Sequence, residues 1–163
     1  MSNADMFLRL EGKSTGLVKG ESNVAEHPDE IEISDWSWGM TGSSALGGAG
    51  TGVRTALSEL RLGKGCDRST TQLMSVMRAN EPIKKAVLTV RKAGTVPPVD
   101  YLIITIQNGR ITSHTIGTTV PGQCELTESL SIAFEQIEVK YSPQSSRGTK
   151  EAALTFQTQV HSS

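Results

Sequence analysis

The sequence predicts a mainly β fold: a small β-barrel of two curled antiparallel sheets, with about eight or more strands and one α-helix near residues 67–80. Three observations support this fold class. Apolar and polar side chains alternate along most of the chain, two long strands change the phase of that alternation midway, and a single segment has helical spacing instead. The 163 residues fit one domain, which we expect to span residues 1–163.

Period-two alternation marks the strands, as in the first one, where Met6, Leu8 and Leu10 share one face. The pair Asn108-Gly109 is the strongest hairpin signal in the chain, so it predicts a two-residue turn between neighbouring strands. By these criteria we expect strands at 6–11, 30–40, 83–92, 101–107, 110–116, 130–141 and 150–160, with loops at 17–28, 94–98 and 117–123.

Two of these strands change their inward face midway. Apolar side chains lie at odd positions up to Ile33 and at even positions from Trp36, and they lie at even positions up to Phe134 and at odd positions from Ile137. An inserted residue, a β-bulge, would reconcile both sets with one core and would curl the sheets towards a closed or nearly closed barrel. Alternatively, the strand passes from one sheet of a sandwich to the other at this point. The changes fall near Ser34 and Asp35, and at Glu135 and Gln136.

Residues 67–80 do not follow the strand pattern. Leu73, Val76 and Met77 recur at helical spacing, which predicts one amphipathic helix. The expected signals at its ends are Asp67 or Ser69 as the N-terminal cap, and Arg78 in the last turn with Pro82 after it.

Composition argues against several classes of partner and site. With 16 Lys and Arg against 17 Asp and Glu, the net charge is −1, so we expect no nucleic-acid partner and no membrane insertion. No apolar run reaches the ~18 residues of a membrane helix, and the N-terminus lacks the pattern of a signal peptide. The cysteines and histidines lack ligand-like spacing, so no metal site is expected, and Cys66 and Cys124 are interpreted as unpaired thiols.

The glycine-rich stretch that begins at Gly42 does not match the motifs of phosphate binding or serine hydrolysis. Gly42 and Gly47 have the gap of a Walker loop, but Gly48 stands where the phosphate-binding lysine must be. A nucleophile elbow starting at Gly42 would need glycine where Leu46 stands. We therefore expect no catalytic residue in this stretch, and no enzymatic activity of the chain.

The same stretch also fails as a dinucleotide-binding fingerprint. Gly48 and Gly50 fit its first two positions, but Val53 occupies the third, so no cofactor is expected. What remains is a low-charge loop of about a dozen residues, a length that is uncommon in compact domains unless the loop has a function. It is either a plain surface loop or a loop that orders against another subunit. The interaction residues in the second case are Gly42, Leu46, Gly47, Gly48, Gly50 and Gly52.

Trp36 and Trp38 are two of only seven aromatic residues, and they share one strand face. Such a pair either packs in a core or interface, or forms a platform on which sugars or bases stack. No basic residue is interleaved with the two indoles, which argues against nucleic acid. We therefore interpret both as core aromatic residues.

Charges of opposite sign gather in two places. An acidic stretch contains Glu30 and Glu32, and a basic stretch contains Lys84 and Lys85. These residues are either solvated strand ends or interface charges that face one another across a subunit boundary. The sequence does not distinguish the two.

Several stretches together resemble the Hcp family (haemolysin co-regulated protein), the tube-forming component of type VI secretion systems. The most specific are IEISDWSWGM at 31–40, AVLTVRKAG at 86–94 and VKYSPQ at 139–144, and DMFLRLEG at 5–12 and YLIITIQNGRITS at 101–113 also match. The matching stretches run in the family's order and cover nearly the whole chain.

The resemblance implies a structural protein that assembles into hexameric rings, which stack into a hollow tube. Its implied partners are copies of itself, the spike protein and contractile sheath of the secretion system, and effectors in the lumen. The loop from Gly42 to Gly52 would reach a neighbouring ring or subunit. The protein would be cytoplasmic before firing and then secreted by a route that needs no signal peptide.

Two other functions remain possible from the residues alone. One is a monomeric β-barrel binding module that holds sugar or nucleic acid through its tryptophans. The other is a hydrolase whose site combines Ser43 or Ser44 with the distant His114.

Overall fold

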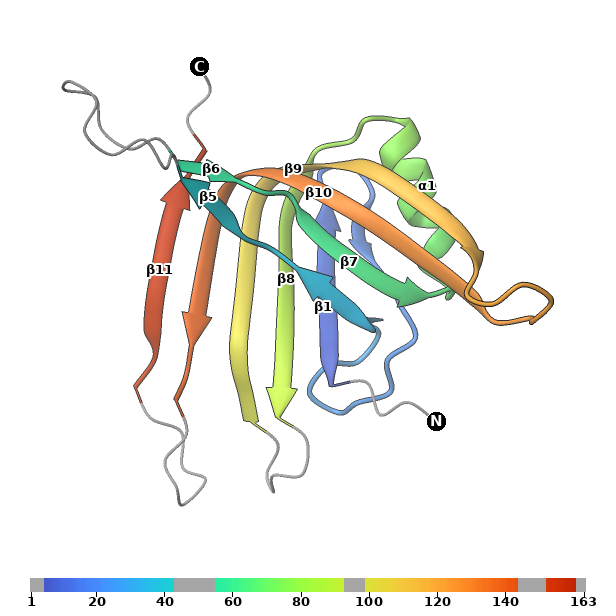
Figure 1. The fold of residues 1–163 in the computed structure, drawn as a ribbon, viewed down its shortest axis with the longest axis horizontal. Helices are drawn as coiled ribbons and strands as arrows, with labels where there is room; N and C mark the ends of the chain where they lie inside the picture. The colour runs from blue at the N-terminus through green and yellow to red at the C-terminus, as the bar shows by residue number, and fades with distance from the viewer. Residues whose placement is uncertain (1–4, 43–54, 93–98, 144–151, 161–163) are drawn as a thin grey trace.

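The computed structural model describes residues 5–42, 55–92, 99–143 and 152–160. Most of these residues form antiparallel strands, and one helix packs beside them (Figure 1). The elements are β1 (Met6–Gly12), β2 (Gly16–Val18), β3 (Ile31–Glu32), β4 (Asp35–Ser37), β5 (Met40–Gly42), β6 (Thr55–Leu57), β7 (Leu60–Gly65), α1 (Thr70–Arg78), β8 (Ile83–Lys92), β9 (Val99–Thr118), β10 (Leu126–Tyr141) and β11 (Leu154–Gln159).

Two antiparallel sheets result, which confirms the predicted fold class. The larger has nine strands in the order β2-β1-β8-β9-β10-β7-β4, with β11 paired to β10 and β3 paired to β1, and the smaller is the β5–β6 hairpin. The large sheet curls but is not a continuous closed barrel. Instead, the segment that contains β3 and β4 bridges its two sides: Ile33 donates its N–H to Met6, and Ser34 donates its N–H to Gly63.

The predicted bulge near Ser34 and Asp35 is replaced by a break in the strand. Residues 31–42 form three short strands, of which β3 pairs with β1 and β4 pairs with β7. The inward face changes because the chain leaves one partner strand for another, which is closer to the alternative of a strand that changes sheets.

The hairpin predicted at Asn108-Gly109 is wrong. β9 continues through both residues, and Gly109 pairs with Phe134 in the ladder between β9 and β10. Asn108 has a φ of 55°, a left-handed conformation that asparagine tolerates. A two-residue hairpin turn of the expected type needs positive φ at both central residues, but only Asn108 of the pair adopts it.

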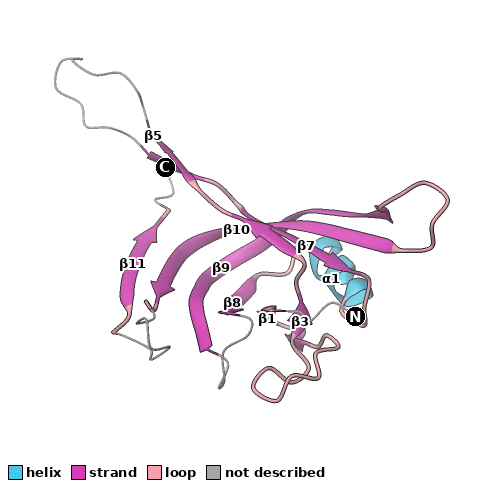
Figure 2. Cartoon of the chain, turned by 60° about the horizontal axis from the view of Figure 1, so that its bottom comes forward, coloured by secondary structure: helices cyan, strands magenta, loops and turns pink. Residues whose placement is uncertain are grey.

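The conformation of Asn108 instead accompanies a change of face in the middle of a long strand. Ile104 and Ile106 are buried before it, and Ile111 is buried after it, so the inward parity changes in β9. The partner strand changes at the same level, since Phe134 and then Ile137 are buried. This confirms the predicted change at Glu135 and Gln136. Figure 2 shows β9 and β10 bending along their length.

The core lies between the curled sheet and α1. Its buried side chains come mainly from β1, β7, β8, β9, β10 and the helix, where Leu73 and Val76 face inwards. Ser69 stands at the N-cap without a side-chain cap bond; instead the Asp67 carboxylate accepts the Ser69 N–H at 2.9 Å. No helix among the described residues is long and apolar enough to cross a membrane.

Gly109 should tolerate no side chain at the bend of β9. A Cβ there would lie 2.7 Å from the Ala133 carbonyl oxygen and 3.2 Å from Ile132 Cγ2. We predict that Gly109→Ala lowers the free energy of unfolding by about 1–3 kcal/mol through overpacking. Gly117→Ala, farther along the same strand where a Cβ meets nothing within 4 Å, is the control and should change it little. Urea unfolding of both variants measures this, and equal stability of the two would contradict the packing argument.

Candidate assembly surfaces

The β5–β6 hairpin projects from the large sheet as an arm (Figure 2). Met40 pairs with Leu57 and Gly42 pairs with Thr55, and the arm leads into the glycine-rich stretch. Met40 is half exposed, so the arm carries an apolar side chain that the chain's own core does not cover. Of the predicted interaction residues, Gly42 belongs to β5, whereas Leu46, Gly47, Gly48, Gly50 and Gly52 lie outside the described residues.

The tryptophans lie at the root of this arm. Trp36 and Trp38 are both partly buried and pack against the core cluster. The indole N–H of Trp38 donates to the Ser58 carbonyl oxygen at 2.9 Å, and the Gly39 N–H donates to the Ser58 hydroxyl at 2.9 Å. These contacts tie the two sides of the arm together where it leaves the sheet.

The charged residues singled out from the sequence lie around β1 and β8. Glu30 Oε2 lies 2.6 Å from His27 Nδ1. Lys84 and Lys85 are exposed on β8. Glu30 and Lys85 also line one cavity of about 470 Å³ within the same chain. Glu32 is exposed opposite Phe7. Contact across a subunit boundary therefore stays a prediction for these charges.

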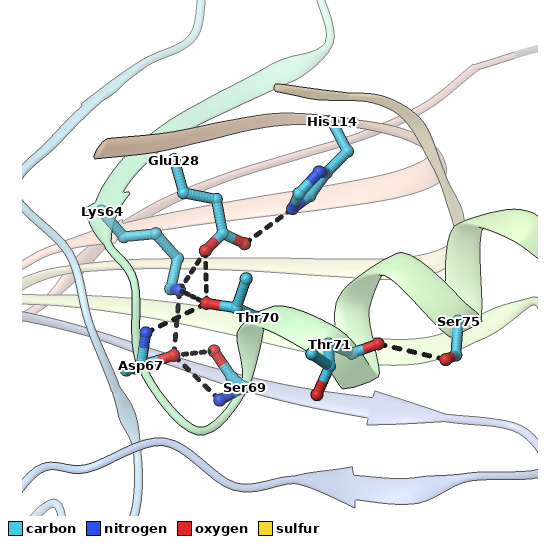
Figure 3. A network of polar contacts seen from close by, with 8 residues as sticks. All are labelled: Lys64, Asp67, Ser69, Thr70, Thr71, Ser75, His114 and Glu128. Atoms are coloured by element: carbon cyan, nitrogen blue, oxygen red, sulfur yellow. Dashed lines mark hydrogen bonds and ion pairs between the residues drawn. The ribbon is translucent and has the colours of Figure 1, made fainter. Parts of the chain in front are cut away.

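A buried polar network closes one end of the core (Figure 3). Lys64 Nζ lies 2.7 Å from Glu128 Oε2, and both side chains are fully buried. Glu128 also accepts the Thr70 hydroxyl at 2.6 Å, and its other oxygen lies 2.8 Å from His114 Nε2. Lys64 also reaches the Asp67 carboxylate at 2.9 Å. The network thus joins β7, β9, β10 and the start of α1.

The pKa of Glu128 lies below its usual value as the result of opposing effects. Burial alone raises the pKa, because it disfavours the carboxylate. Hydrogen bonds from Lys64, Thr70 and His114, together with the positive charge of Lys64, lower it and outweigh burial. The carboxylate is therefore held in its charged form, as a structural partner of Lys64.

Sequence reasoning missed this network, although the pattern contained a signal for it. Lys64 follows Leu60 and Leu62 at the inward positions of β7, and Glu128 precedes Leu130 at those of β10. A charged residue at an inward position needs a partner. Two such residues of opposite sign therefore predict an ion pair between them.

The rival hydrolase site gains no support from the geometry. His114 belongs to the buried network and contacts Glu128, while Ser43 and Ser44 lie outside the described residues. No group of three or more metal-ligating side chains occurs in the described ranges.

Exposed apolar side chains gather at two places besides the arm. Nine large apolar residues are exposed in the described part of the chain, and seven of them fall into two groups. One group lies on β11, on the residue that follows it and on the adjoining end of β10. The other lies at the connected ends of β9 and β10 and in the turn between them. Exposed clusters of this kind mark interaction sites rather than ordinary surface.

The described geometry thus offers apolar surfaces and an arm rather than a pocket with convergent chemistry. A family model for the type VI secretion system effector Hcp matches residues 7–141. The chain belongs to the Hcp family. Protein hcp1 of Pseudomonas aeruginosa is 38% identical to it over 149 residues, which span 90% of this chain and 88% of that protein.

Solved structures agree on the Hcp fold. A type six secretion system protein superposes with a TM-score of 0.81 at 17% identity, covering 95% of this chain and 96% of that one. Hcp1 from Salmonella typhimurium gives 0.72 at 20% identity, with 95% of each chain covered. A type VI secretion effector from Yersinia pestis gives 0.73 at 22% identity, with 96% of this chain and all of that one covered.

The Hcp family supplies a component of the type VI secretion system. This chain is accordingly a type VI secretion tube protein. The comparisons lend no support to a monomeric module that binds sugar or nucleic acid.

The Glu128 network should make the stability of the fold depend on pH. Because the pKa of Glu128 is lower in the folded chain than the ~4.3 of an unperturbed glutamate, its contribution is present above that value and is lost as pH falls through the folded pKa. We predict that Glu128→Gln lowers the free energy of unfolding by about 3–5 kcal/mol at pH 7, as expected for a broken buried ion pair. The difference from the unmodified chain should shrink as pH falls below about 4.

Denaturant unfolding from pH 7 to pH 2 measures this dependence. Glu135→Gln is the control, since Glu135 is exposed on the same strand, and it should leave stability almost unchanged at every pH. A Glu128→Gln variant whose deficit stays constant down to pH 2 would contradict the assigned role of the carboxylate.

Proposed function

We propose that six copies of this chain close into a ring and that rings stack into a hollow tube whose lumen carries effectors. The observation that carries the proposal is the apolar surface that a single copy leaves exposed on a chain of the Hcp family. β11 pairs only with β10, and no other described strand pairs with its outer backbone edge. An open apolar edge is an aggregation liability, and a closed ring can cover it.

The tube has no enzymatic role in this proposal. Its partners are further copies of itself, the spike protein and the contractile sheath, and effectors held in the lumen. It resides in the cytoplasm before firing and is then secreted. The arm supports stacking, because β5 and β6 lead away from the sheet and Met40 exposes apolar surface on them. The loop from Gly42 to Gly52 would then meet a neighbouring ring or subunit.

Light scattering coupled to size-exclusion chromatography tests the ring directly. We predict a particle near six times the 17.4 kDa chain mass, stable to dilution because obligate ring contacts are large and partly apolar. A monomer at all concentrations would contradict the proposal. A monomer that binds soluble sugar or oligonucleotide with a change in tryptophan fluorescence would favour the binding-module alternative.

The charged stretches give a further expectation about the ring. If Lys84 and Lys85 face Glu30 and Glu32 of a neighbour, then Lys84→Glu with Lys85→Glu should weaken assembly, and adding Glu30→Lys with Glu32→Lys should restore it. The same chromatography measures both variants, at low salt where screening is small. Lys140→Glu, a charge change on β10, is the matched control. If the variant that carries only Lys84→Glu and Lys85→Glu forms an unchanged hexamer, these charges do not lie in the interface.

A further inference from the structure

Seven exposed apolar side chains form two patches on different parts of the chain. We call the first the β11 patch; it consists of Tyr141, Leu154, Phe156 and Val160. We call the second the hairpin-end patch; it consists of Ile116, Val120 and Leu126. Each of these side chains is more than two-fifths exposed, and Leu154 reaches 64%.

The β11 patch extends the inner side of the sheet beyond the core. Phe156 pairs with Val139, which packs on the core, and Leu154 pairs with Tyr141. Side chains paired across two strands lie on one face, so Phe156 and Leu154 continue the apolar face past the last buried residues of the described part of β10. β11 is held by β10 alone among the described strands, with one side-chain bond from Gln157 to Glu138 at 2.7 Å.

The hairpin-end patch extends the inner side of the sheet at the other end of β10, where β10 pairs with β9. Ile116 pairs with Glu128 and Leu126 pairs with Thr118. Glu128 points into the buried network, so Ile116 lies on the inner side of the sheet. Beyond that network no described element covers the strands, and Ile116 and Leu126 are exposed.

The two patches lie on opposite sides of the molecule. In Figure 1, β11 forms one side, and the connected ends of β9 and β10 project from the other side, beyond α1. A ring with cyclic symmetry uses two different surfaces of each subunit, one for each neighbour. Two apolar patches on opposite sides meet this requirement, whereas a two-fold dimer would need one self-complementary patch.

We propose that the β11 patch of one copy packs against the hairpin-end patch of the next copy around the ring. The occupant of each patch is therefore a second copy of this chain, bound head to tail. This assignment rests on the proposed ring, and it adds which surfaces meet and which residues they contribute.

The first test disrupts each patch separately. Variant A carries Leu154→Asp and Phe156→Asp, and variant B carries Ile116→Asp and Leu126→Asp. We expect each to shift the midpoint of hexamer formation to at least tenfold higher protein concentration. Controls with aspartates on the opposite face of the same strands are Thr155→Asp with Gln159→Asp, and Thr115→Asp with Thr127→Asp. Circular dichroism confirms that the variants remain folded, and a hexamer unchanged in folded A or B would overturn the assignment.

The second test asks whether the contact is head to tail and does not depend on disruption. In a Cys66→Ser, Cys124→Ser background, one variant carries Phe156→Cys, a second carries Leu126→Cys, and a third carries both. A short flexible bismaleimide should link the third into covalent ladders of up to six chains. It should link an equal mixture of the first two into covalent dimers, and leave either one alone unlinked.

The outcomes separate this inference from the ring proposal. A background protein that is itself monomeric removes the ring and the assignment together. A hexameric background without ladders overturns the assignment alone. Efficient linking of Phe156→Cys to itself would show that β11 meets another β11, and this also contradicts the head-to-tail contact.

Discussion

Two long strands that change their inward face midway determine the architecture of this protein. A strand alternates its side chains with a period of two, so one extra residue transfers every later side chain to the opposite face. In β9 the inward face changes at Asn108, with a φ of 55°, and changes back after Ile111, where the register with β10 shifts; in β10 it changes between Phe134 and Ile137. The same pair of strands therefore continues from the β8 and β11 side of the sheet to the β7 side while keeping apolar residues inwards.

The bend also explains why a single copy leaves apolar surface exposed at both ends of β9 and β10. These strands are longer than the core that the chain can cover, so their ends extend past it in both directions. At one end the buried pair of Lys64 and Glu128 closes the core, and the hairpin beyond it is exposed. At the other end β11 adds a strand that lacks a second neighbour among the described residues. In the proposed ring, neighbouring copies cover both ends without any other protein.

Much of the fold could be predicted because alternation reports directly which face is buried. It identified the first strand, β8, the single helix and the change of face near Gln136. It could not tell how the face changes: near Ser34 the chain exchanges partner strands, and at Asn108 a residue typical of turns bends a strand instead. The local sequence favours the left-handed conformation of Asn108. The pairing with neighbouring strands determines whether that conformation makes a hairpin turn or bends a continuous strand. The candidate assembly surfaces could not be predicted from the sequence in this way, because the exposure of Ile116 or Phe156 depends on where the core ends.

The central claim is that this bent sheet is a subunit of a closed ring of identical copies. Negative-stain electron microscopy of the purified chain tests it most directly, since shape is observed without any substitution. The account predicts annular particles with six-fold symmetry and a central hole, alone or in short stacks. A field of small compact particles of single-chain size, at concentrations where the protein is fully folded, would contradict it.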